Sequence, residues 1–346
     1  MKRTMLAGVA MTLAMGLAAH AETEPGFEAP QTAWGKPDLQ GFWVNTSVTS
    51  LQRPRGVEDL VVSEDEAHAI VDRNPLIILA REDEALQGEE NLEKDILADN
   101  NADRGYNAFW IDPGNRLAQV KGEYRTSWIV EPADGRVPFK EGAATKVYGT
   151  GYSPVNFDGP ETRPLAERCL MSFSGSAGPV MQNGMYNNTF QFVQTPDTLM
   201  INVEMNHDAR IIPIDAEFNP LQPAKWAGDS RGWYEGDTLV VETRKPHPGQ
   251  RALISDEGKL TERFTRWSED EILYEFTVED PTLYTSTWKG EMALRRTDEP
   301  LHEYACHEGN YAMPGILGGA RKIESEGGTP SLGPGITAGI NVPPVE

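Results

Sequence analysis

The sequence predicts a mainly β protein in which antiparallel strands follow one another as a meander and close into a barrel, with a helical insertion near the N-terminus. Short segments rich in Val, Ile, Thr, Tyr, Phe and Trp recur through the second half of the 346-residue chain. Turn-forming residues separate these segments at hairpin spacing. By contrast, residues 60–100 have Leu and Ile at helical spacing, which indicates the insertion.

An export signal opens the chain. Lys2 and Arg3 precede an apolar run over residues 5–18, and Ala-His-Ala at 19–21 fits a cleavage site. The apolar run is too short to span a bilayer. We therefore expect residues 1–21 to be a signal peptide that is cleaved near Ala21, and the mature protein to be periplasmic or secreted.

The charge and the missing motifs limit the partners. A formal net charge of −22 disfavours nucleic acid and anionic membrane surfaces. The sequence has no phosphate-binding loop, dinucleotide fingerprint or haem-attachment CxxCH motif. We expect a small-molecule ligand or substrate, no nucleic acid, no cofactor and no membrane insertion of the mature chain, while the oligomeric state stays open.

Residues 22–105 combine an extended lead-in, a first strand and the helical insertion. Ser63 and Glu66 have the spacing of a capping box, which predicts a helix to about residue 72. Pro75 can begin a second helix that reaches as far as Leu97. We expect residues 63–97 to be largely helical and to lie outside the barrel.

Residues 106–321 form the predicted β-barrel domain. A turn at 132–135 is expected to join strands at 124–131 and 136–139 as a hairpin. The Gly-, Ser- and Asn-rich stretch 140–188 is long for a connection, so we expect it to cover a cavity mouth. Further strands are expected at 190–194, 198–213, 232–234, 238–243, 259–267, 271–279, 285–296 and 302–307. The Gly- and Pro-rich residues 322–346 are expected to be a disordered tail.

The residues Gly41-Phe42-Trp43 at the first strand resemble the opening of lipocalin-like barrels. The resemblance implies that the tryptophan packs across the closed end of the barrel. It concerns architecture and does not define a function.

Cys169 and Cys306 are the two cysteines of the chain. One pair in an exported protein predicts a disulfide, and two buried free thiols are the alternative. A catalytic cysteine is less expected, because nothing nearby in the sequence shows a base paired with either residue.

Residues 200–215 hold most of the polar groups that a site needs. Read as one strand, the stretch places His207 on its apolar face, and Asp208 and Arg210 on the other face. One interpretation is a solvated face with a surface Asp208–Arg210 pair and a histidine satisfied in the core. The other is that one face lines a cavity, as barrel interiors allow. A bulge would be required for all three side chains to join one site.

Three further places carry candidate residues. In the Gly-Asp-Ser-Arg-Gly sequence at 228–232, the Arg231 guanidinium can bind an oxyanion while Asp229 orients it. The alternative is a plain turn. In Cys-His-Glu-Gly-Asn at 306–310, His307 can act as general acid or base, and a strand-end cap is the alternative. Glu279 can act as a general acid beside a second carboxylate, or simply face solvent.

These assignments define the predicted site. The predicted catalytic residues are His207, His307, Asp208 and Glu279, and the predicted substrate-binding residues are Arg210, Arg231, Asp229 and Glu308. The two histidines with one or two of these acids would suit Zn²⁺. No H-x-H or H-E-x-x-H spacing supports such an ion, and no metal is predicted.

Several longer phrases resemble a large family of exported bacterial proteins. They are HDARIIP at 207–213, GDSRGWYEGDTLVV at 228–241, YEFTVEDP at 274–281 and YACHEGN at 304–310. The resemblance covers about residues 106–321 and implies a shared fold. It carries no activity and no catalytic residue over to this chain.

Two functions from different classes fit these observations. The first is an exported enzyme that uses cofactor-free acid–base chemistry on a small organic substrate, as a lyase, isomerase, hydratase or hydrolase. The alternative is a periplasmic barrel that binds an apolar or amphipathic small molecule without catalysis, and a structural envelope protein is a third option. Convergence of His207 and His307 on one cavity, with an arginine at its wall, would favour the enzyme.

Overall fold

The computed structural model describes residues 23–75, 77–78, 80–81, 114–144, 147, 157–172, 178, 180–184, 186–221, 223–247 and 253–330. The expected signal peptide 1–21, most of the second helix at 75–97, the start of the barrel domain at 106–113 and the last residues of the tail lie outside this part.

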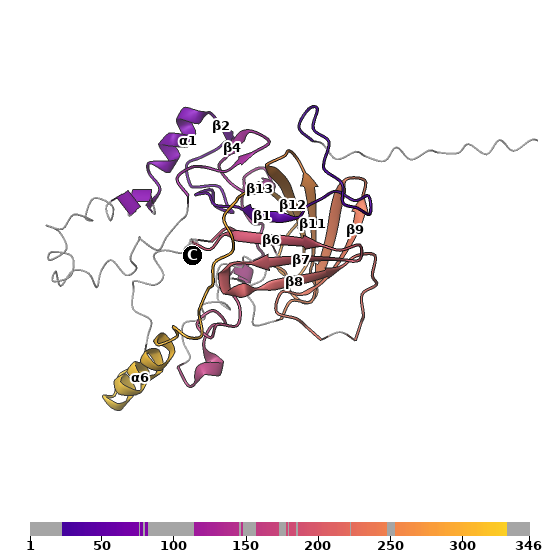
Figure 1. Cartoon of the computed structure of the whole chain (residues 1–346). Helices are drawn as coiled ribbons and strands as arrows, with labels where there is room; N and C mark the ends of the chain where they lie inside the picture. Colours follow the sequence, from indigo (N-terminus) through magenta and orange to yellow (C-terminus); the bar gives the residue numbers. More distant parts are fainter. Residues whose placement is uncertain are drawn as a thin grey trace, which may run out of the picture.

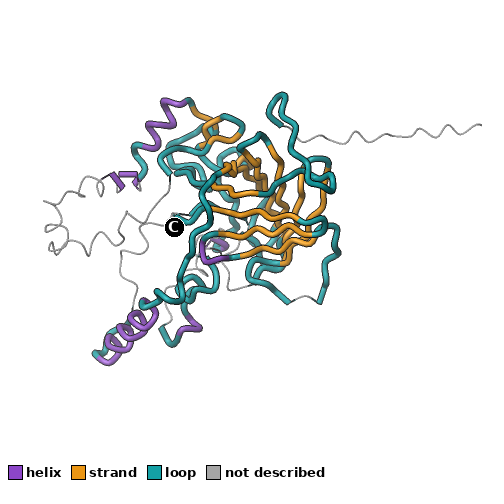
Figure 2. The backbone as a smooth tube through the Cα atoms, in the orientation of Figure 1, coloured by secondary structure: helices purple, strands orange, loops and turns teal. Residues whose placement is uncertain are grey.

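The protein is mainly β, and its central feature is a nearly closed, antiparallel barrel-like sheet (Figure 1). The strands of the barrel are β1 (Gly41–Val44), β6 (Thr189–Gln194), β7 (Thr198–Val203), β8 (Ala209–Pro213), β9 (Asp229–Glu235), β10 (Thr238–Arg244), β11 (Lys259–Arg266), β12 (Glu271–Glu279) and β13 (Trp288–Arg296). Figure 2 shows these strands gathered in one body, with the helices over Glu64–Val71 and Ala312–Ser325 outside it. The predicted fold class is therefore confirmed.

The strand order follows the chain around the barrel. Each strand from β6 to β8 and from β9 to β13 pairs with the next in antiparallel fashion, and β1 lies between β13 and β6. A cycle of nine strands cannot be antiparallel at every contact, so one neighbouring pair must run parallel. That pair is β8 and β9, which meet through a single parallel bridge between Ile214 and Gly232. The barrel is therefore least closed at this seam.

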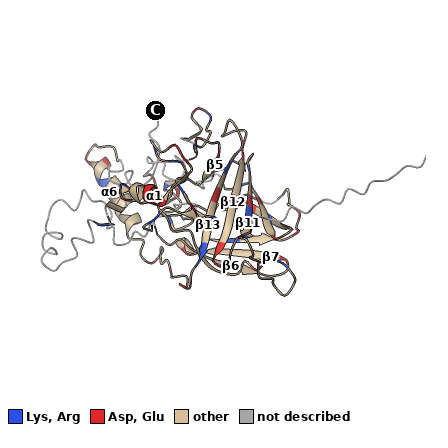
Figure 3. Ribbon diagram, turned by 90° about the horizontal axis from the view of Figure 1, so that it is seen from above, with Lys and Arg blue, Asp and Glu red and all other residues tan. Residues whose placement is uncertain are grey.

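Alternate residues of each strand form the interior, as the period of a strand requires. Trp43, Phe192, Phe264, Phe276 and Trp288 are among the fully buried side chains. Uncharged residues make up most of the strands when the barrel is viewed from above (Figure 3). The core of the protein is therefore the inside of the barrel.

One end of the barrel is closed by Trp43. Its indole Nε1 donates a hydrogen bond to the Leu39 carbonyl at 3.0 Å. The guanidinium carbons of Arg266 and Arg296 each lie 5.0 Å from its ring centroid, a distance at which cations are attracted to the ring. Trp43 is fully buried, as the Gly-x-Trp resemblance implied.

A small lobe lies beside the barrel (Figure 1). Its described part includes the helix α1 (Glu64–Val71) and a three-stranded sheet of β2 (Val61–Val62), β3 (Gln119–Val120) and β4 (Glu123–Arg125). The predicted capping box is present, because Ser63 N donates to Glu66 Oε2 at 3.0 Å and Glu66 N donates to Ser63 Oγ at 3.4 Å. The described residues contain no helix that is both long and apolar enough to cross a membrane.

The expected hairpin at 124–139 is wrong in its second strand. The turn forms, with Gly135 at φ 67° and its N–H bonded to the Pro132 carbonyl. However, β5 (Ile129–Glu131) pairs with β13 and not with residues 136–139. β13 extends beyond the end of β1 and offers free backbone groups there, so a long-range pairing replaces the local one.

Two expectations near the C-terminus are also wrong. Residues 302–307 contain no strand, since they run as an irregular segment along the loops of the barrel. The helix α6 (Ala312–Ser325) extends into the region expected to be a disordered tail. Three glycines weaken this helix, but the Asn310 side-chain oxygen accepts a hydrogen bond from Met313 N and supports its first turn.

Candidate functional site

The end of the barrel opposite Trp43 carries the turn between β7 and β8 and most of the predicted site, and it is called the open end below, as in lipocalin-like barrels. The predicted strand 198–213 is in fact two strands, β7 and β8, joined by a tight turn over Met205–His207. His207 is therefore not in the middle of a strand, and its side chain is exposed. The imidazole Nε2 accepts a hydrogen bond from Tyr304 N at 3.3 Å.

The turn explains why Asp208 and Arg210 point away from the side of the chain on which His207 lies. Asn206 and His207 both have positive φ, at 61° and 52°, which is the conformation of a tight hairpin turn. After the turn, Asp208 and Arg210 are both buried, at 7% and 3% exposure. The turn therefore does not join the three side chains in one site as a bulge would have done, because Arg210 enters the barrel while His207 stays outside.

Asp208 lies at the rim of the open end. Its Oδ2 accepts a hydrogen bond from Ser172 N at 2.9 Å. Burial raises the pKa of Asp208 to about 6, while the hydrogen bonds from Ser172 and Asn206 and the charge of His207 oppose the rise. Asp208 is thus a carboxyl group that exchanges its proton near neutral pH.

Arg210 forms a buried ion pair inside the barrel. Its Nη1 donates to Glu262 Oε1 at 2.9 Å, and its Nη2 contacts Glu262 Oε2 in the same bidentate pair. The Tyr274 hydroxyl donates to Glu262 Oε1 at 2.7 Å, and Met181 N donates to the Tyr274 oxygen at 3.1 Å. Both charged side chains are at most 1% exposed. The predicted role of Arg210 as a substrate-binding residue does not fit this geometry, because both terminal nitrogens of its guanidinium already bind Glu262.

Burial and charge act in opposite directions on this cluster. Burial disfavours the charged form of Arg210, but the Glu262 carboxylate outweighs it and keeps the pKa of Arg210 above its usual value. Burial, and then the charge of Glu262, raise the pKa of Tyr274 well above its usual value. The cluster therefore contains a charged pair and a neutral phenol at neutral pH.

Aromatic rings fill the barrel next to this cluster. Ring centroids lie 5.7 Å apart for Phe192 and Phe264, 5.0 Å for Phe264 and Tyr274, 5.7 Å for Tyr274 and Phe276, and 5.6 Å for Phe276 and Trp288. At these distances the rings contact one another. Much of the apolar surface that an apolar ligand would need is therefore used by the protein itself.

The C-terminal segment 302–310 lies against the turn at the open end. His302 N donates to the buried Glu204 carboxylate at 3.3 Å, and Tyr304 N donates to His207.

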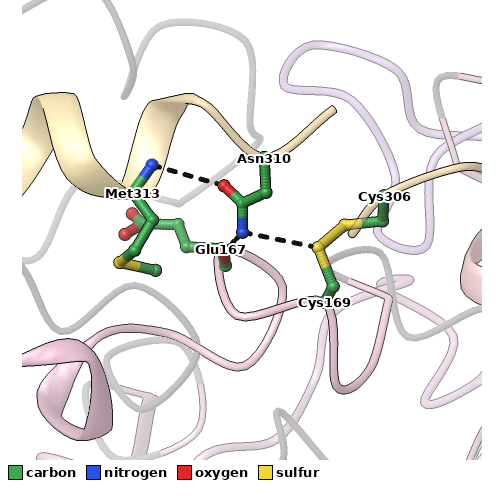
Figure 4. The surroundings of a disulfide bond; sticks show 5 residues. All are labelled: Glu167, Cys169, Cys306, Asn310 and Met313. Atoms are coloured by element: carbon green, nitrogen blue, oxygen red, sulfur yellow. Dashed lines mark hydrogen bonds between the residues drawn. A yellow bond between two sulfur atoms is a disulfide. The ribbon is translucent and has the colours of Figure 1, made fainter. Parts of the chain in front are cut away.

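The predicted disulfide between Cys169 and Cys306 is confirmed, with the Cα atoms 5.7 Å apart. Figure 4 shows Asn310 beside this disulfide, where its Nδ2 donates to the Glu167 carbonyl at 2.8 Å. His307 and Glu308, both exposed, are thus held on the same side of the barrel as His207.

Backbone strain is concentrated at the open end. Six of the eight described non-glycine residues with positive φ lie there: Cys169, Val180, Asn187, Asn206, His207 and Lys245. Val180 is the least expected of them, because a β-branched residue is rarely found in this region. Such conformations cost free energy and are held where the surrounding structure enforces them, often at functional sites.

The other predicted site residues pair with neighbours of their own. Arg231 donates to Asp229 Oδ1 at 2.8 Å and to the Glu217 carbonyl at 3.0 Å on the outer side of β9. Glu279 forms a partly exposed ion pair with Lys259 at 2.7 Å. Asp229 also binds Lys225 at 2.9 Å. Asp229 and Glu279 begin β9 and end β12 at the same end of the barrel as the β7–β8 turn, but their partners in the described structure are these neighbours and not His207 or Asp208.

Two buried carboxylates were missed from the sequence. Glu262 alternates with Leu260 and Phe264 on β11, so a charged residue on the apolar face of a strand was the signal that could have identified it. Glu204, whose Oε2 accepts from Thr189 N at 3.3 Å, is hidden by the turn that follows it. Its role depends on contacts between distant segments, which no local pattern reveals.

Comparison with known protein families, curated proteins and solved structures finds no match to this chain. Within the described residues, no three His, Cys, Asp or Glu side chains are grouped so that they could hold a metal ion. The site is therefore interpreted from its own chemistry.

Proposed function

We propose that this protein is an exported enzyme that acts on a small organic molecule by acid–base chemistry at the open end of its barrel. Asp208 is the proposed proton donor and acceptor, with His207 next to it in the chain. His307 is a second imidazole on the segment that lies against the same turn.

The observation that carries the proposal is the buried Asp208 carboxyl beside the exposed His207. An ordinary aspartate is almost fully ionised at neutral pH and is a poor general acid. A carboxyl group with a pKa of about 6 exists in both forms near the working pH, which is the condition for efficient proton transfer. Ser172 N–H holds one carboxylate oxygen in place.

The surrounding backbone gives independent support. Two consecutive residues of the turn, Asn206 and His207, adopt left-handed conformations without a glycine. Contacts from Tyr304 and His302 and the Cys169–Cys306 disulfide hold the neighbouring segment against that turn. Groups fixed in this way keep their geometry, as an active site requires.

The binding-protein alternative has less support. A ligand of the apolar kind needs free apolar surface inside the barrel, and the chain of aromatic contacts from Phe192 to Trp288 uses much of it. The described interior instead contains the bidentate ion pair of Arg210 and Glu262.

The test does not require knowledge of the substrate. The protein is incubated with a pool of small organic molecules in D₂O, and separately in H₂¹⁸O, and products are followed by mass spectrometry. A lyase, isomerase or hydratase would introduce solvent deuterium at carbon, and a hydrolase or hydratase would introduce ¹⁸O. We expect label incorporation by the wild-type protein and its loss in Asp208→Asn.

Asp280→Asn is the matched control. Asp280 is another buried aspartate, but its carboxylate accepts hydrogen bonds from Ser255 N and Thr282 N, and its pKa is lowered. This variant is expected to lose stability and to keep activity in its folded fraction. Equal label incorporation by wild-type protein and Asp208→Asn would refute the proposal.

A further inference from the structure

A second place in the molecule has the features of a binding site, and the acid–base proposal does not use it. Where β1 ends at Val44, the chain leaves the barrel and runs beside residues 114–119 and the C-terminal half of β13. A cleft of about 300 Å³ lies between these three segments. This volume is at the lower end of the range for small-molecule sites and exceeds what an inorganic oxyanion needs.

Buried polar groups without partners line this cleft. Asn45 and Ser47 are only 3% and 4% exposed. Neither the Nδ2 and Oδ1 atoms of Asn45 nor the Oγ of Ser47 has a hydrogen-bond partner among the residues that the structure describes. Buried polar atoms of native proteins are nearly always paired, because an unpaired one loses its hydration without compensation. Three such atoms beside one cleft indicate a ligand that pairs with them.

A glycine allows the 114–119 segment to approach residues 46–47 closely. Gly114 has φ 74°, and a Cβ at this position would lie 3.0 Å from Thr46 Cγ2 and 3.4 Å from the Ser47 backbone. A side chain here would be crowded by residues 46–47 and strained by the positive φ, so glycine suits this close approach. The 114–119 segment is further fixed by the hydrogen bonds from Val48 N to the Arg116 carbonyl and from Ala118 N to Thr49 Oγ1.

The charge of the cleft is opposite to the charge of the protein. The chain has 53 acidic and 31 basic residues, yet the described lining contains three arginines and no Asp or Glu. Arg295 is partly neutralised by Glu271 at 3.3 Å, and Arg296 lies against Trp43. Arg116 is exposed, and its guanidinium forms no hydrogen bond or ion pair with the described residues.

We propose that this cleft binds a small organic carboxylate. Arg116 would hold the carboxylate, since its planar fork matches the two oxygens. Asn45 and Ser47 would pair with a polar group at the other end of the molecule, because their amide and hydroxyl groups can both donate and accept. The site is on the outside of the barrel near Trp43, so it is separate from the open end.

The experiment measures binding of four probes by isothermal titration calorimetry: malate, succinate, the neutral analogue succinamide and inorganic phosphate. We expect malate and succinate to bind at millimolar or lower concentration and succinamide to bind more weakly. Arg116→Met and Asn45→Leu should each weaken carboxylate binding about tenfold or more. Arg263→Gln, which removes an exposed arginine on β11, is the control and should leave binding unchanged.

Asn45→Leu also separates a ligand contact from a structural role. Because the amide of Asn45 has no partner among the described residues, replacing it with an apolar side chain of similar size should leave the melting temperature unchanged or raise it. A lower melting temperature together with unchanged carboxylate binding would show that Asn45 is structural. Equal binding of succinate and succinamide, binding of phosphate alone, or no binding of either carboxylate would each overturn the proposal. None of these outcomes depends on the activity of Asp208.

Discussion

The Arg210 guanidinium on β8 and the Glu262 carboxylate on β11 form a bidentate ion pair across the least closed part of the barrel. β8 and β9 meet through one parallel bridge only, so few backbone hydrogen bonds join the two ends of the sheet. Arg210 crosses this seam, and its Nη2 also donates to Thr243 Oγ1 on β10 at 3.2 Å. Side chains therefore connect β8 to β10 and β11 where the backbone ladder is nearly absent.

Removing one member of this pair should be strongly destabilising. Glu262→Gln would leave the Arg210 charge buried without its counterion, and we expect a loss of about 3–5 kcal/mol in the free energy of unfolding. Chemical denaturation followed by tryptophan fluorescence measures the loss. The double variant Arg210→Met/Glu262→Leu should lose less than the sum of the two single variants, because it leaves no buried charge.

The exposed pair of Arg263 and Glu235 provides the matched control. It joins β11 to β9 with a similar distance of 2.8 Å, but its side chains are 37% and 49% exposed. Glu235→Gln should therefore change stability by less than about 1 kcal/mol. Equal effects of Glu262→Gln and Glu235→Gln would show that the buried pair does not hold the seam.

Asp208 should make stability depend on pH in a defined direction. Burial raises its pKa from the usual 3.8 to about 6, so between these values the folded protein binds more protons than the unfolded chain. The stability that Asp208 contributes is fully present below about pH 4 and is lost as the pH rises through about 6. The loss amounts to roughly 3 kcal/mol. Unfolding curves at pH 4 to 7 should show it for the wild type and not for Asp208→Asn, and parallel curves for the two proteins would contradict it.

The turn over Met205–His207 explains where the sequence-based interpretation of the site succeeded and failed. Polar and apolar residues alternate through 198–213, so the period of a strand continues across the turn. Asn206 and His207 take the two positive-φ positions that Asn-Gly usually occupies in hairpins. Without the glycine, the sequence gives little sign of a turn. Because this turn cannot be recognised from the sequence, the positions expected for His207 and Asp208 differ from those in the structure.

The barrel and the disulfide could be predicted because their signals are local or compositional. Strand periodicity, hairpin turns, the capping box at Ser63 and one cysteine pair in a chain expected to be exported each have a physical reason that acts within a short window or through composition. The polar cluster around Glu262 and the cleft at Asn45 depend on which distant segments meet. A lone Asn after a strand carries no such information until β13 and residues 114–119 are placed beside it.

Loss of the disulfide should release the C-terminal segment from the open end. The bond joins residues 137 positions apart, so it restricts a large loop in the unfolded chain. We expect Cys169→Ser/Cys306→Ser to lose roughly 2–5 kcal/mol of stability. The amides of Tyr304 and His302, which donate to His207 and Glu204, should also exchange faster with deuterium. An unchanged denaturation midpoint after reduction of the wild type would contradict this expectation.

Gly290 tests the packing of the barrel interior. It lies on β13 directly opposite Phe276 of β12, and a Cβ at this position would collide with the Phe276 ring. That ring is held on both sides by Tyr274 and Trp288, so it cannot move away without displacing them. Overpacking of this kind costs roughly 1–3 kcal/mol, and we expect a loss of this size for Gly290→Ala in urea denaturation.

Two further variants decide whether the collision is the cause of that loss. Gly290→Ala/Phe276→Leu should recover part of the stability relative to the sum of the single variants, because the smaller side chain makes room for the methyl group. Gly319→Ala in α6 is the matched control, since nothing lies within 4 Å of its added Cβ and alanine favours the helix. It should be neutral or stabilising. If Gly290→Ala is as well tolerated as Gly319→Ala, the interior at this position has free space, and the barrel then has room for a ligand beside Phe276.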